Sequence, residues 1–396
     1  MKTAIIIGGG VTGLSTAYHL ARKKYGRIIV FDKGPVGDGS SSRAAGIITG
    51  LLWSETGVRV RQLSLKLFRE LSRDLDGYQF QEAGCLNLFD AAAWPDREKL
   101  LPLYDRLQAP YEILTPAEIK SRWPALSPNP DYVGLYDPLG GYSEPDEYLP
   151  ALARRVRELG VEIRESEMVK NFILHEGRVA GVQTAAGVIE CDAVVSTVYA
   201  WTLPLIKRVG LIFPVKNFVH QRYVTSPLPQ PLKFPAVNAN PMFGYIRPAA
   251  GERLLLGVET AERDEHRVES LDFHLSALTV ASDLKDKMKE NFIPLLPALK
   301  STTWELEKIG LLTFTMDGEP MLGPVSALPG LFLGVGFHSG GFAYNPASGQ
   351  MLAEFVSEGR TSIDVSAFSP DRFSREETAD YLKMTLSQQN VVRRRH

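Results

Sequence analysis

The sequence predicts an α/β fold in which a Rossmann-type parallel sheet is joined to a discontinuous second α+β unit on a mainly antiparallel sheet. A short apolar run at residues 4–7 leads through a glycine-rich turn into an apolar-periodic helix, followed by a second apolar run at 28–31. A similar strand, glycine-rich turn and helix begin at residue 331. Between them, strand-like segments recur at 215–225, 236–239, 244–247 and 254–258, as in an antiparallel sheet.

The first turn carries a G-x-G-x-x-G motif formed by Gly8, Gly10 and Gly13. Gly8 permits the tight turn, Gly10 lets a pyrophosphate approach the backbone, and Gly13 lets the helix pack close to the sheet. The helix N-terminus adds free N–H groups and the positive end of its dipole. Asp32 follows at roughly the 20 residues expected of an acid that binds a ribose diol. The motif predicts FAD or NAD rather than NADP, the alternative being a glycine-rich turn in an unrelated α/β unit.

A loop of small residues follows this unit at 34–46 and contains Ser40, Ser41, Ser42 and Arg43. The serines are candidates for the N-cap of a second helix. Such a helix start would bring more N–H donors and an arginine to the same pyrophosphate. The alternative is an ordinary surface loop.

The composition excludes several classes of function. The chain of 396 residues is long enough for two domains, and its formal net charge of −2 gives no general attraction to nucleic acid. Cys85 and Cys191 form neither a disulfide framework nor a metal-ligand spacing, so no metal is expected. No apolar run reaches transmembrane length, and the N-terminus enters a strand at once. We expect a cytoplasmic enzyme.

The other segments indicate a discontinuous arrangement. Further helices are expected at 60–75, 94–107, 116–123, 148–159, 270–289 and 347–357. Further strands are expected at 80–89, 161–164, 169–174, 179–184, 188–190, 191–197, 302–314 and 331–335. The expected nucleotide-binding domain comprises 1–75, 150–209 and 316–375. The expected second domain comprises 76–149 and 210–315, with its sheet covered on one face by helix 270–289, and 376–396 form a C-terminal tail.

Several of these stretches together resemble one family, the FAD-dependent amine and amino-acid oxidoreductases of the D-amino-acid oxidase superfamily. It includes sarcosine oxidases, glycine oxidase, dimethylglycine dehydrogenase and dye-linked proline dehydrogenases. The most specific stretch is D-G-x-P-x-x-G-P at 317–324, followed by a strand and a glycine-rich turn into a helix. The other similar stretches are 5–33, 39–46, 192–201, 334–355 and 364–369.

The resemblance implies an FAD-binding domain with a separate substrate-binding domain. The residues that it implies for FAD are Gly8, Gly10, Val11, Thr12, Gly13, Asp32, Lys33, Ser40, Ser41, Ser42, Arg43, Ala45, Gly46, Val169, Thr197, Gly336, Ser339, Gly340, Gly341 and Phe342. Some relatives attach FAD through a cysteine in the last third or a histidine after the serine loop. This chain has no cysteine beyond 191 and no histidine between 20 and 174, so non-covalent FAD is expected.

The implied reaction is oxidation of the C–N bond of a small amine or amino acid, such as sarcosine, glycine, proline or dimethylglycine. A hydride passes to the flavin, and the resulting imine hydrolyses. Ala343 and Thr49 stand where relatives carry a Lys and an Arg that bind a substrate carboxylate. Arg247 is our first candidate for the missing cation and Arg222 the second, although a strand arginine commonly pairs with a nearby acid.

Two further residues complete the expected catalytic set with Arg247. Tyr245 matches a pocket tyrosine of relatives, and His338, beside the flavin turn, would touch the donor amine, its alternative role being to cap a backbone group.

The electron acceptor is predicted from another departure. Leu255 stands where oxidases of the sarcosine type carry a lysine near the flavin. Because a cation there would stabilise charge developing on oxygen, its absence favours a dehydrogenase that passes electrons to a protein or quinone. The alternatives are an NAD-linked dehydrogenase, a flavoenzyme oxidising a 2-hydroxy acid, and a non-catalytic flavin-carrying subunit of an electron-transfer complex. The oligomeric state stays open.

Overall fold

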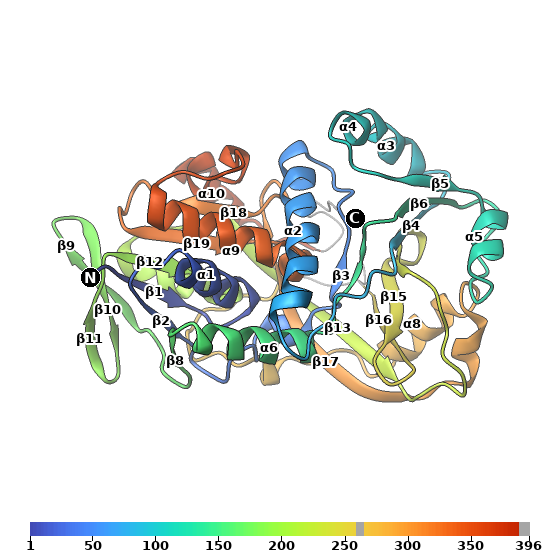
Figure 1. The fold of residues 1–396 in the computed structure, drawn as a ribbon, viewed down its shortest axis with the longest axis horizontal. Helices are drawn as coiled ribbons and strands as arrows, with labels where there is room; N and C mark the ends of the chain where they lie inside the picture. The colour runs from blue at the N-terminus through green and yellow to red at the C-terminus, as the bar shows by residue number, and fades with distance from the viewer. Residues whose placement is uncertain (259–264, 388–396) are drawn as a thin grey trace.

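The computed structural model of the chain describes residues 1–258 and 265–387. A six-stranded and an eight-stranded sheet lie at opposite ends of the molecule, with the long helix α2 (Glu55–Asp74) between them (Figure 1). The fold is therefore mixed α/β with one parallel-rich sheet and one mainly antiparallel sheet, as the sequence predicts.

The six-stranded sheet has the order β18-β19-β12-β1-β2-β8. All its pairs are parallel except β18 with β19. Alternate residues of the short apolar strand β1 serve opposite faces, since Ile6 packs into one core cluster and Ile5 and Ile7 into another. The strands are β1 (Thr3–Ile7), β2 (Arg27–Phe31), β8 (Glu162–Arg164), β12 (Ala193–Ser196), β18 (Met321–Pro324) and β19 (Leu331–Val335).

Helices α1 (Val11–Arg22), α6 (Pro145–Glu158) and α9 (Gly341–Glu358) cover one face of this sheet (Figure 1). Helices α1 and α9 approach so closely that a Cβ at Gly349 would lie 2.2 Å from the Ser15 Oγ. A three-stranded sheet packs on the other face through Phe172, Val179 and Val182. Its strands are β9 (Asn171–His175), β10 (Arg178–Thr184) and β11 (Gly187–Glu190).

The eight-stranded sheet has the order β17-β13-β16-β15-β14-β4-β6-β5 and joins strands from two distant parts of the chain where β14 pairs with β4. Leu284, Met288 and Phe292 of α8 pack on one face. The strands are β4 (Cys85–Phe89), β5 (Glu112–Leu114), β6 (Val133–Asp137), β13 (Val215–Thr225), β14 (Ala236–Ala239), β15 (Gly244–Ala249), β16 (Arg253–Val258) and β17 (Trp304–Thr315). A small two-stranded ribbon, β3 (Ile47–Ile48) with β7 (Gly141–Tyr142), adjoins the sheet. The remaining helices are α3 (Trp94–Glu98), α4 (Leu101–Arg106), α5 (Pro116–Arg122), α7 (Thr202–Ile206), α8 (Leu284–Phe292) and α10 (Arg375–Lys383).

The predicted helix at 270–289 is wrong over 270–283. Its place is taken by irregular chain with a short turn at Leu275–Ala277, and α8 begins only at Leu284. The carbonyls of Leu271 and Phe273 accept hydrogen bonds from the Lys33 ammonium, at 2.7 and 2.5 Å, so they are withdrawn from helical bonding. A tertiary contact here overrides the local periodicity.

Helix α9 begins six residues before its predicted start at 347, despite Pro346 inside it. Proline cannot donate to the carbonyl of Phe342, which would be its helical partner. The Asn345 side-chain amide donates to that carbonyl instead, at 2.5 Å. Asn345 in turn accepts from the Tyr148 hydroxyl at 2.7 Å, so the proline is accommodated without an unpaired group at this carbonyl.

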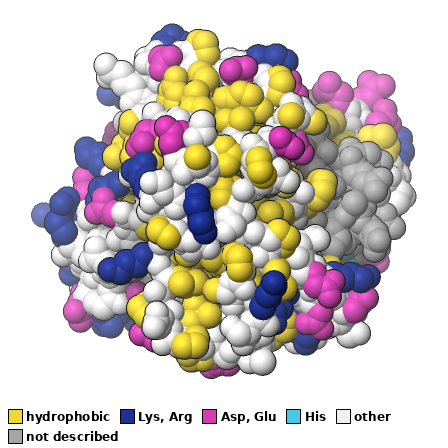
Figure 2. Space-filling model, turned by 90° about the vertical axis from the view of Figure 1, so that its right-hand side faces the viewer, with side chains coloured by type: hydrophobic (Ala, Val, Ile, Leu, Met, Phe, Trp, Pro, Cys, Tyr) yellow, Lys and Arg dark blue, Asp and Glu magenta, His cyan; other side chains and the backbone are white. Residues whose placement is uncertain are grey.

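The surface carries charges of both signs. On the face shown in Figure 2, basic and acidic side chains surround a band of hydrophobic ones, in keeping with the small net charge. None of the helices in the described ranges is both long and apolar enough to cross a membrane.

The half-buried His19 makes stability depend on pH. Burial, helped by Arg22, lowers the pKa of His19 in α1 from 6.5 to about 3. The unfolded chain therefore takes up the proton first as the pH falls below 6.5, and stability is lost in this window by at most about 1.4 kcal/mol per pH unit. We expect His19→Gln to flatten the fall in free energy of unfolding, measured by urea titration from pH 6.5 to about pH 4. The control His175→Gln, at an exposed site, should keep the wild-type slope. An unchanged slope in His19→Gln would contradict this account.

Candidate active site

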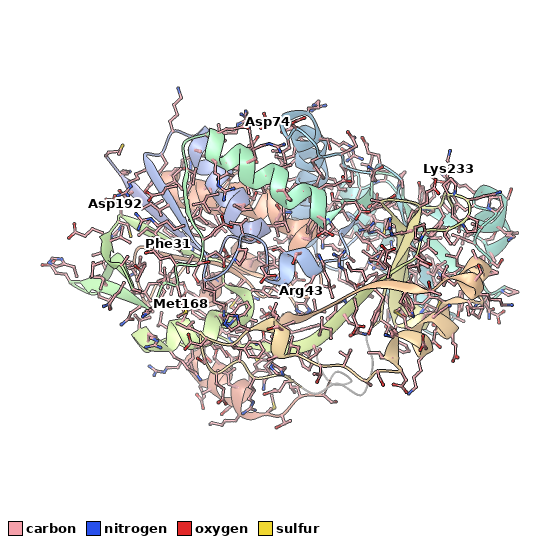
Figure 3. All side chains as sticks on the ribbon, turned by 90° about the horizontal axis from the view of Figure 1, so that it is seen from below. Phe31, Arg43, Asp74, Met168, Asp192 and Lys233 are labelled. Atoms are coloured by element: carbon pink, nitrogen blue, oxygen red, sulfur yellow. The ribbon has the colours of Figure 1, made fainter. Side chains whose placement is uncertain are left out.

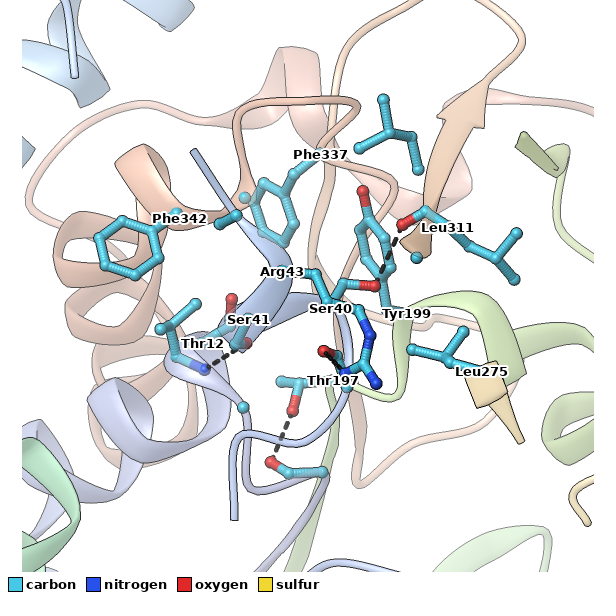
Figure 4. Close-up of a pocket in the computed structure, with 18 of the residues that line it drawn as sticks. Thr12, Ser40, Ser41, Arg43, Thr197, Tyr199, Leu275, Leu311, Phe337 and Phe342 are labelled. Carbon is cyan, nitrogen blue, oxygen red and sulfur yellow. Dashed lines mark hydrogen bonds between the residues drawn. The ribbon is translucent and has the colours of Figure 1, made fainter. Parts of the chain in front are cut away.

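A cavity of about 300 Å³ lies where the carboxyl ends of the parallel strands meet the eight-stranded sheet. This is the edge at which open α/β sheets bind ligands. Figure 4 shows its wall, with Phe337 from the turn before α9 and Phe342 from the first turn of α9 on one side, and Tyr199, Leu275 and Leu311 on another. In the view from below, Phe31 and Met168 mark one end of the wall and Arg43 lies near the centre of the molecule (Figure 3).

The glycines of the first turn are required by close contacts. A Cβ at Gly10 would lie 2.8 Å from the Ser41 Oγ, and a Cβ at Gly13 would lie 1.9 Å from the Gly8 carbonyl oxygen. Gly8 has a φ of +105°, which a side chain rarely adopts. Thr197, at the end of β12, holds the turn by donating to the Gly8 carbonyl at 3.1 Å (Figure 4). Gly13 itself lies outside the cavity wall and acts in packing.

Two helices point their N-termini at this cavity. In the described chain, neither α1 nor α9 has a side-chain hydrogen bond from its N-cap or an acidic residue in its first turn. The Val11 amide of α1 donates to the Ser41 Oγ at 3.0 Å. The positive ends of both helix dipoles are thus left to whatever occupies the cavity, which favours anionic or electron-rich groups.

Asp32, at the end of β2, borders the cavity and accepts from the amides of Gly9 (2.8 Å) and Gly34 (3.0 Å). Burial raises the pKa of this carboxyl, while the two amides oppose the shift. A carboxylate has about four acceptor positions, so capacity for a ribose diol is left. Lys33 also borders the cavity, but its ammonium is bound to the carbonyls of Leu271 and Phe273, and burial lowers its pKa.

The serine loop is anchored to β17. Ser40 donates to the Leu311 carbonyl at 3.1 Å, and the Arg43 Nε donates to the Ile309 carbonyl at 2.8 Å. Ser42 departs from expectation. It lies outside the wall of the cavity, and its carbonyl accepts from Arg222 at 2.8 Å and from Lys308 at 3.1 Å.

Neither predicted carboxylate-binding arginine borders the described cavity wall. Arg247 is completely buried and forms a bidentate ion pair with Glu144, at 2.7 and 2.9 Å, while its Nε donates to the Ala45 carbonyl at 2.6 Å. This corrects the expectation for Arg247, because its charge is neutralised by the acid. Arg222 is likewise held by the loop, through Ser42. Both arginines position the serine loop over the sheet.

The sheet side of the cavity carries a hydrogen-bonded pair, Tyr245 and His220, whose Oη and Nε2 atoms lie 2.8 Å apart. The sequence analysis identified Tyr245 but missed His220 and the neighbouring Asn238. Gly257 lies opposite Tyr245 on β16, and a Cβ there would be 2.1 Å from the Tyr245 hydroxyl. Because Gly257 has no side chain, the Tyr245 side chain can pass over β16 and reach His220 on β13. A glycine paired with a tyrosine on the neighbouring strand is the sequence signal for this arrangement.

Two strained residues meet at the turn before α9. His338 has a φ of 54° and Tyr199 a φ of 49°, values uncommon outside glycine. The Tyr199 hydroxyl donates to the His338 carbonyl, the His338 amide donates to Thr313 at 3.0 Å, and the Phe314 ring lies 4.2 Å from the His338 ring. Backbone strain of this kind concentrates at functional sites. These contacts hold both the backbone and the ring of His338 in place at the cavity wall.

Most of the predicted residues meet at this cavity. Those that border it are Gly8, Gly10, Val11, Thr12, Asp32, Lys33, Ser40, Ser41, Arg43, Ala45, Gly46, Val169, Thr197, Tyr245, His338, Ser339, Gly341 and Phe342. Those that do not are Gly13, Ser42, Gly336, Gly340 and Arg247. The structure adds wall residues without sequence motifs, among them Phe31, Glu167, Met168, Tyr199, Trp201, Asn240, Phe243 and His274.

The fold and cavity define a dinucleotide-binding α/β protein with a second sheet closing over the ligand. A family model described as DAO, FAD dependent oxidoreductase, matches residues 3–355, and the chain belongs to this family. FAD is the family's cofactor, and the uncapped helix ends, the glycine contacts and Asp32 fit such a dinucleotide.

Similar proteins include 4-methylaminobutanoate oxidase (formaldehyde-forming) of Paenarthrobacter nicotinovorans, 29% identical over 96% of this chain. The chain spans 46% of that protein's length. Glycine oxidase of Pseudomonas putida is 27% identical over 93% of this chain and 98% of its own. The crystal structure of L-proline dehydrogenase from P. horikoshii superposes with a TM-score of 0.86 at 26% identity, covering 95% of this chain and 98% of the other.

The contact at Gly13 gives a direct test of the cofactor site. In Gly13→Ala the new methyl group would meet the Gly8 carbonyl, so the helix must move away from the strand. We expect FAD affinity to fall by at least about tenfold and stability by about 1–3 kcal/mol. The measurements are bound flavin absorbance and urea unfolding. Gly181→Ala is the control, since a Cβ there would lie 2.5 Å from the Ile189 carbonyl oxygen in the three-stranded sheet, outside the cavity wall, and should lower stability while FAD affinity is kept. Wild-type FAD affinity in Gly13→Ala would contradict the assignment.

Proposed function

We propose that the chain oxidises the C–N bond of a small amine or amino acid, with FAD as hydride acceptor, giving an imine that water hydrolyses. The observation that carries the proposal is the cavity itself, with two uncapped helix N-termini on one side and the Tyr245–His220 pair on the sheet side. The similar proteins are named for 4-methylaminobutanoate, glycine and L-proline, each an amine with hydrogen on a neighbouring carbon. FAD supplies the two-electron acceptor.

In this proposal one group of residues binds FAD and another orients the amine substrate. The turn at Gly8, Gly10 and Gly13 and the start of α1 bind the pyrophosphate, Asp32 binds the ribose, and the turn at 339–342 faces the ring. Tyr245, His220 and His338 hold the amine with its donor carbon toward the ring, and the two sheets exclude water. No strong acid or base is needed for hydride transfer, so orientation is the main task of these side chains.

Binding of FAD is proposed to be non-covalent. The described cavity wall contains no cysteine, and Cys85 and Cys191 lie elsewhere. The histidines of the cavity wall are His220, His274 and His338, and none of them lies directly after the serine loop at 34–46, where some relatives attach FAD. We also propose the domain boundaries given above, with the exception that 375–383 form helix α10 rather than free tail, its Tyr381 packing with Phe218 and Phe314.

The proposed activity is a dehydrogenase that passes electrons to a protein or quinone. Lys33 and Arg43 are the lysine and the arginine of the described wall, and main-chain carbonyls accept hydrogen bonds from both side chains. Leu255 is fully buried and does not border the cavity. A wall with so little available positive charge supports slow reaction with oxygen.

Reduction by substrate tests the function. We expect anaerobic addition of at least one of sarcosine, 4-methylaminobutanoate, glycine, L-proline and dimethylglycine to bleach the flavin absorbance of the purified protein. On admitting air, we expect slow reoxidation, accelerated by a quinone. A 2-hydroxy acid serves as the control donor. Bleaching by the hydroxy acid alone, or by no donor, would overturn amine oxidation, and rapid reoxidation with peroxide formation would overturn the dehydrogenase assignment.

The Tyr245–His220 pair makes a second prediction. Removing the hydroxyl in Tyr245→Phe breaks the 2.8 Å hydrogen bond and loosens the orientation of the amine. We expect the rate constant for flavin reduction in stopped flow to fall by roughly tenfold, which corresponds to about 1.4 kcal/mol. Tyr111→Phe, far from the cavity wall on the surface, is the matched control. An unchanged rate in Tyr245→Phe would remove this pair from the mechanism.

A further inference from the structure

A row of polar side chains crosses the face of the eight-stranded sheet that is turned to the cavity. Asn87 of β4 is paired with Asn238 of β14, and Asn238 is paired with Tyr245 of β15. His220 of β13 extends the row through its contact with Tyr245, whose Oη lies 2.8 Å from the His220 Nε2. Residues next to them in the strands face the other way, into an apolar core cluster, as Val237 does. The polar groups are therefore confined to the cavity side of the sheet.

Asn87 begins a chain of hydrogen bonds that has a single possible direction. The Asn87 side chain is completely buried, and its Nδ2 donates to the Leu135 carbonyl at 3.3 Å. A main-chain carbonyl can only accept, so turning the Asn87 amide over would bring two acceptors together. The Asn87 Oδ1 is therefore held on the side of Asn238, where it needs a donor.

Asn238 takes its orientation from this acceptor. Its Nδ2 donates to the Asn87 Oδ1 at 3.0 Å and lies 3.5 Å from the Cys85 Sγ. Asn238 borders the cavity, whereas Asn87 and Cys85 do not, so the amide nitrogen is turned into the protein. Within the described ranges, both hydrogen bonds of the Asn238 side chain are made by this nitrogen. The Oδ1 is left as a fixed and uncharged acceptor at the cavity wall.

An amine needs an acceptor of this kind. The helix N-termini on the opposite side of the cavity present N–H donors, which cannot bind the N–H of an amine. The carboxylates of the described wall, Asp32, Asp38 and Glu167, follow β2 and β8 of the parallel sheet rather than strands of the eight-stranded sheet. Asn238 thus offers the sheet side an acceptor without a negative charge.

The missing charge matters for hydride transfer. A carboxylate beside the amine would stabilise the ammonium form, whereas an amide oxygen favours it less and lets the ammonium proton leave to solvent. The neutral amine is the form that reacts, because its lone pair forms the C=N bond as the electron pair of the neighbouring C–H bond leaves as hydride. An N–H held by the amide oxygen keeps this lone pair out of the hydrogen bond.

We propose that the Asn238 Oδ1 accepts a hydrogen bond from the substrate amine and selects amines that keep an N–H in their neutral form. The inference rests on the proposed function and adds to it a preference for primary and secondary amines over tertiary ones. A neutral tertiary amine has no hydrogen to donate, so it leaves the Oδ1 without a partner in the closed site. Asn87 acts through Asn238, as a positioning residue that fixes the amide.

Two ligands that cannot react test the acceptor in the FAD-loaded protein. 2-Aminoisobutyrate has no hydrogen on the carbon that bears its nitrogen, so it cannot give hydride, and pivalate carries a methyl group in place of the amine. Changes in flavin absorbance report the binding of either ligand. On the wild type we expect 2-aminoisobutyrate to bind roughly 10- to 100-fold more tightly than pivalate, as for a charge-assisted hydrogen bond. Equal affinities would overturn the proposal without any variant.

Asn238→Leu removes the acceptor with little change in volume. We expect this variant to lose the preference for 2-aminoisobutyrate and to keep its affinity for pivalate, because only the amine uses the Oδ1. Loss of affinity for both ligands would indicate a merely structural role. Asn171→Leu is the matched control, at a strand asparagine of β9 outside the cavity wall, and should bind as wild type. A preference that survives in Asn238→Leu, or is lost in Asn171→Leu, would contradict the assignment.

The positioning role of Asn87 is tested by coupling. Asn87→Leu frees the Asn238 amide to turn, so we expect part of the amine preference to be lost. In the double variant the loss should equal that of Asn238→Leu alone, because the two residues act as one unit. Additive losses would remove Asn87 from this account. The double variant leaves neither amide of the pair without its partner, so it carries the ligand test if a single variant does not fold.

Flavin reduction separates this inference from the proposed function. We expect sarcosine, a secondary amine, to bleach the wild-type flavin at least about tenfold faster than dimethylglycine, and Asn238→Leu to reduce this ratio. Bleaching by amines with dimethylglycine as the fastest donor would leave the function standing and remove the selectivity. An Asn238-dependent preference for 2-aminoisobutyrate, without bleaching by any amine, would keep the acceptor site and remove amine oxidation.

Discussion

The close approach of α1 to the end of β1, where a Cβ at Gly13 would lie 1.9 Å from the Gly8 carbonyl oxygen, sets the geometry on which the rest of the cavity depends. Because neither residue has a side chain, α1 starts directly at the end of β1, and its first amides face the space between the two sheets. Thr197 from β12 and Ser41 from the loop then close around this point. The same solution is used at α9, where glycines precede the helix and Gly340 admits the guanidinium of Arg61. Backbone approach, rather than side-chain chemistry, brings the two helix dipoles together.

The parts of the fold that could be predicted are those governed by local patterns. The G-x-G-x-x-G turn, Asp32 and the buried strands follow from spacing and periodicity, and they identified the part of the cavity wall formed by residues 8–12 and Asp32. Contacts between residues far apart in the chain could not be predicted from local sequence patterns. The withdrawal of the Leu271 and Phe273 carbonyls by Lys33, which breaks the expected helix, has no local signature. The early start of α9 depends likewise on an asparagine side chain that replaces the missing proline donor.

The arginines show the same limit most clearly. Sequence alone favours Arg247 because it lies in a strand beside a pocket tyrosine, yet its partner Glu144 is far away in the chain. Arg61 lies in an amphipathic helix, where a charged residue ordinarily faces solvent. Only the packing of α2 against α9 turns it inward, onto Tyr344. Which cation is neutralised is decided by tertiary partners.

The order of strands in the six-stranded sheet has a consequence for biosynthesis. β1 lies between β2 and β12, and β12 lies between β1 and β19, whose residues emerge from the ribosome more than a hundred positions later. Until then the outer edge of β12 has no strand beside it, and the second helix dipole has not been made. Newly synthesised chains therefore expose a sheet edge open to misassembly. A nucleotide site that uses the N-terminus of α9 is therefore complete only after residue 341 has been synthesised.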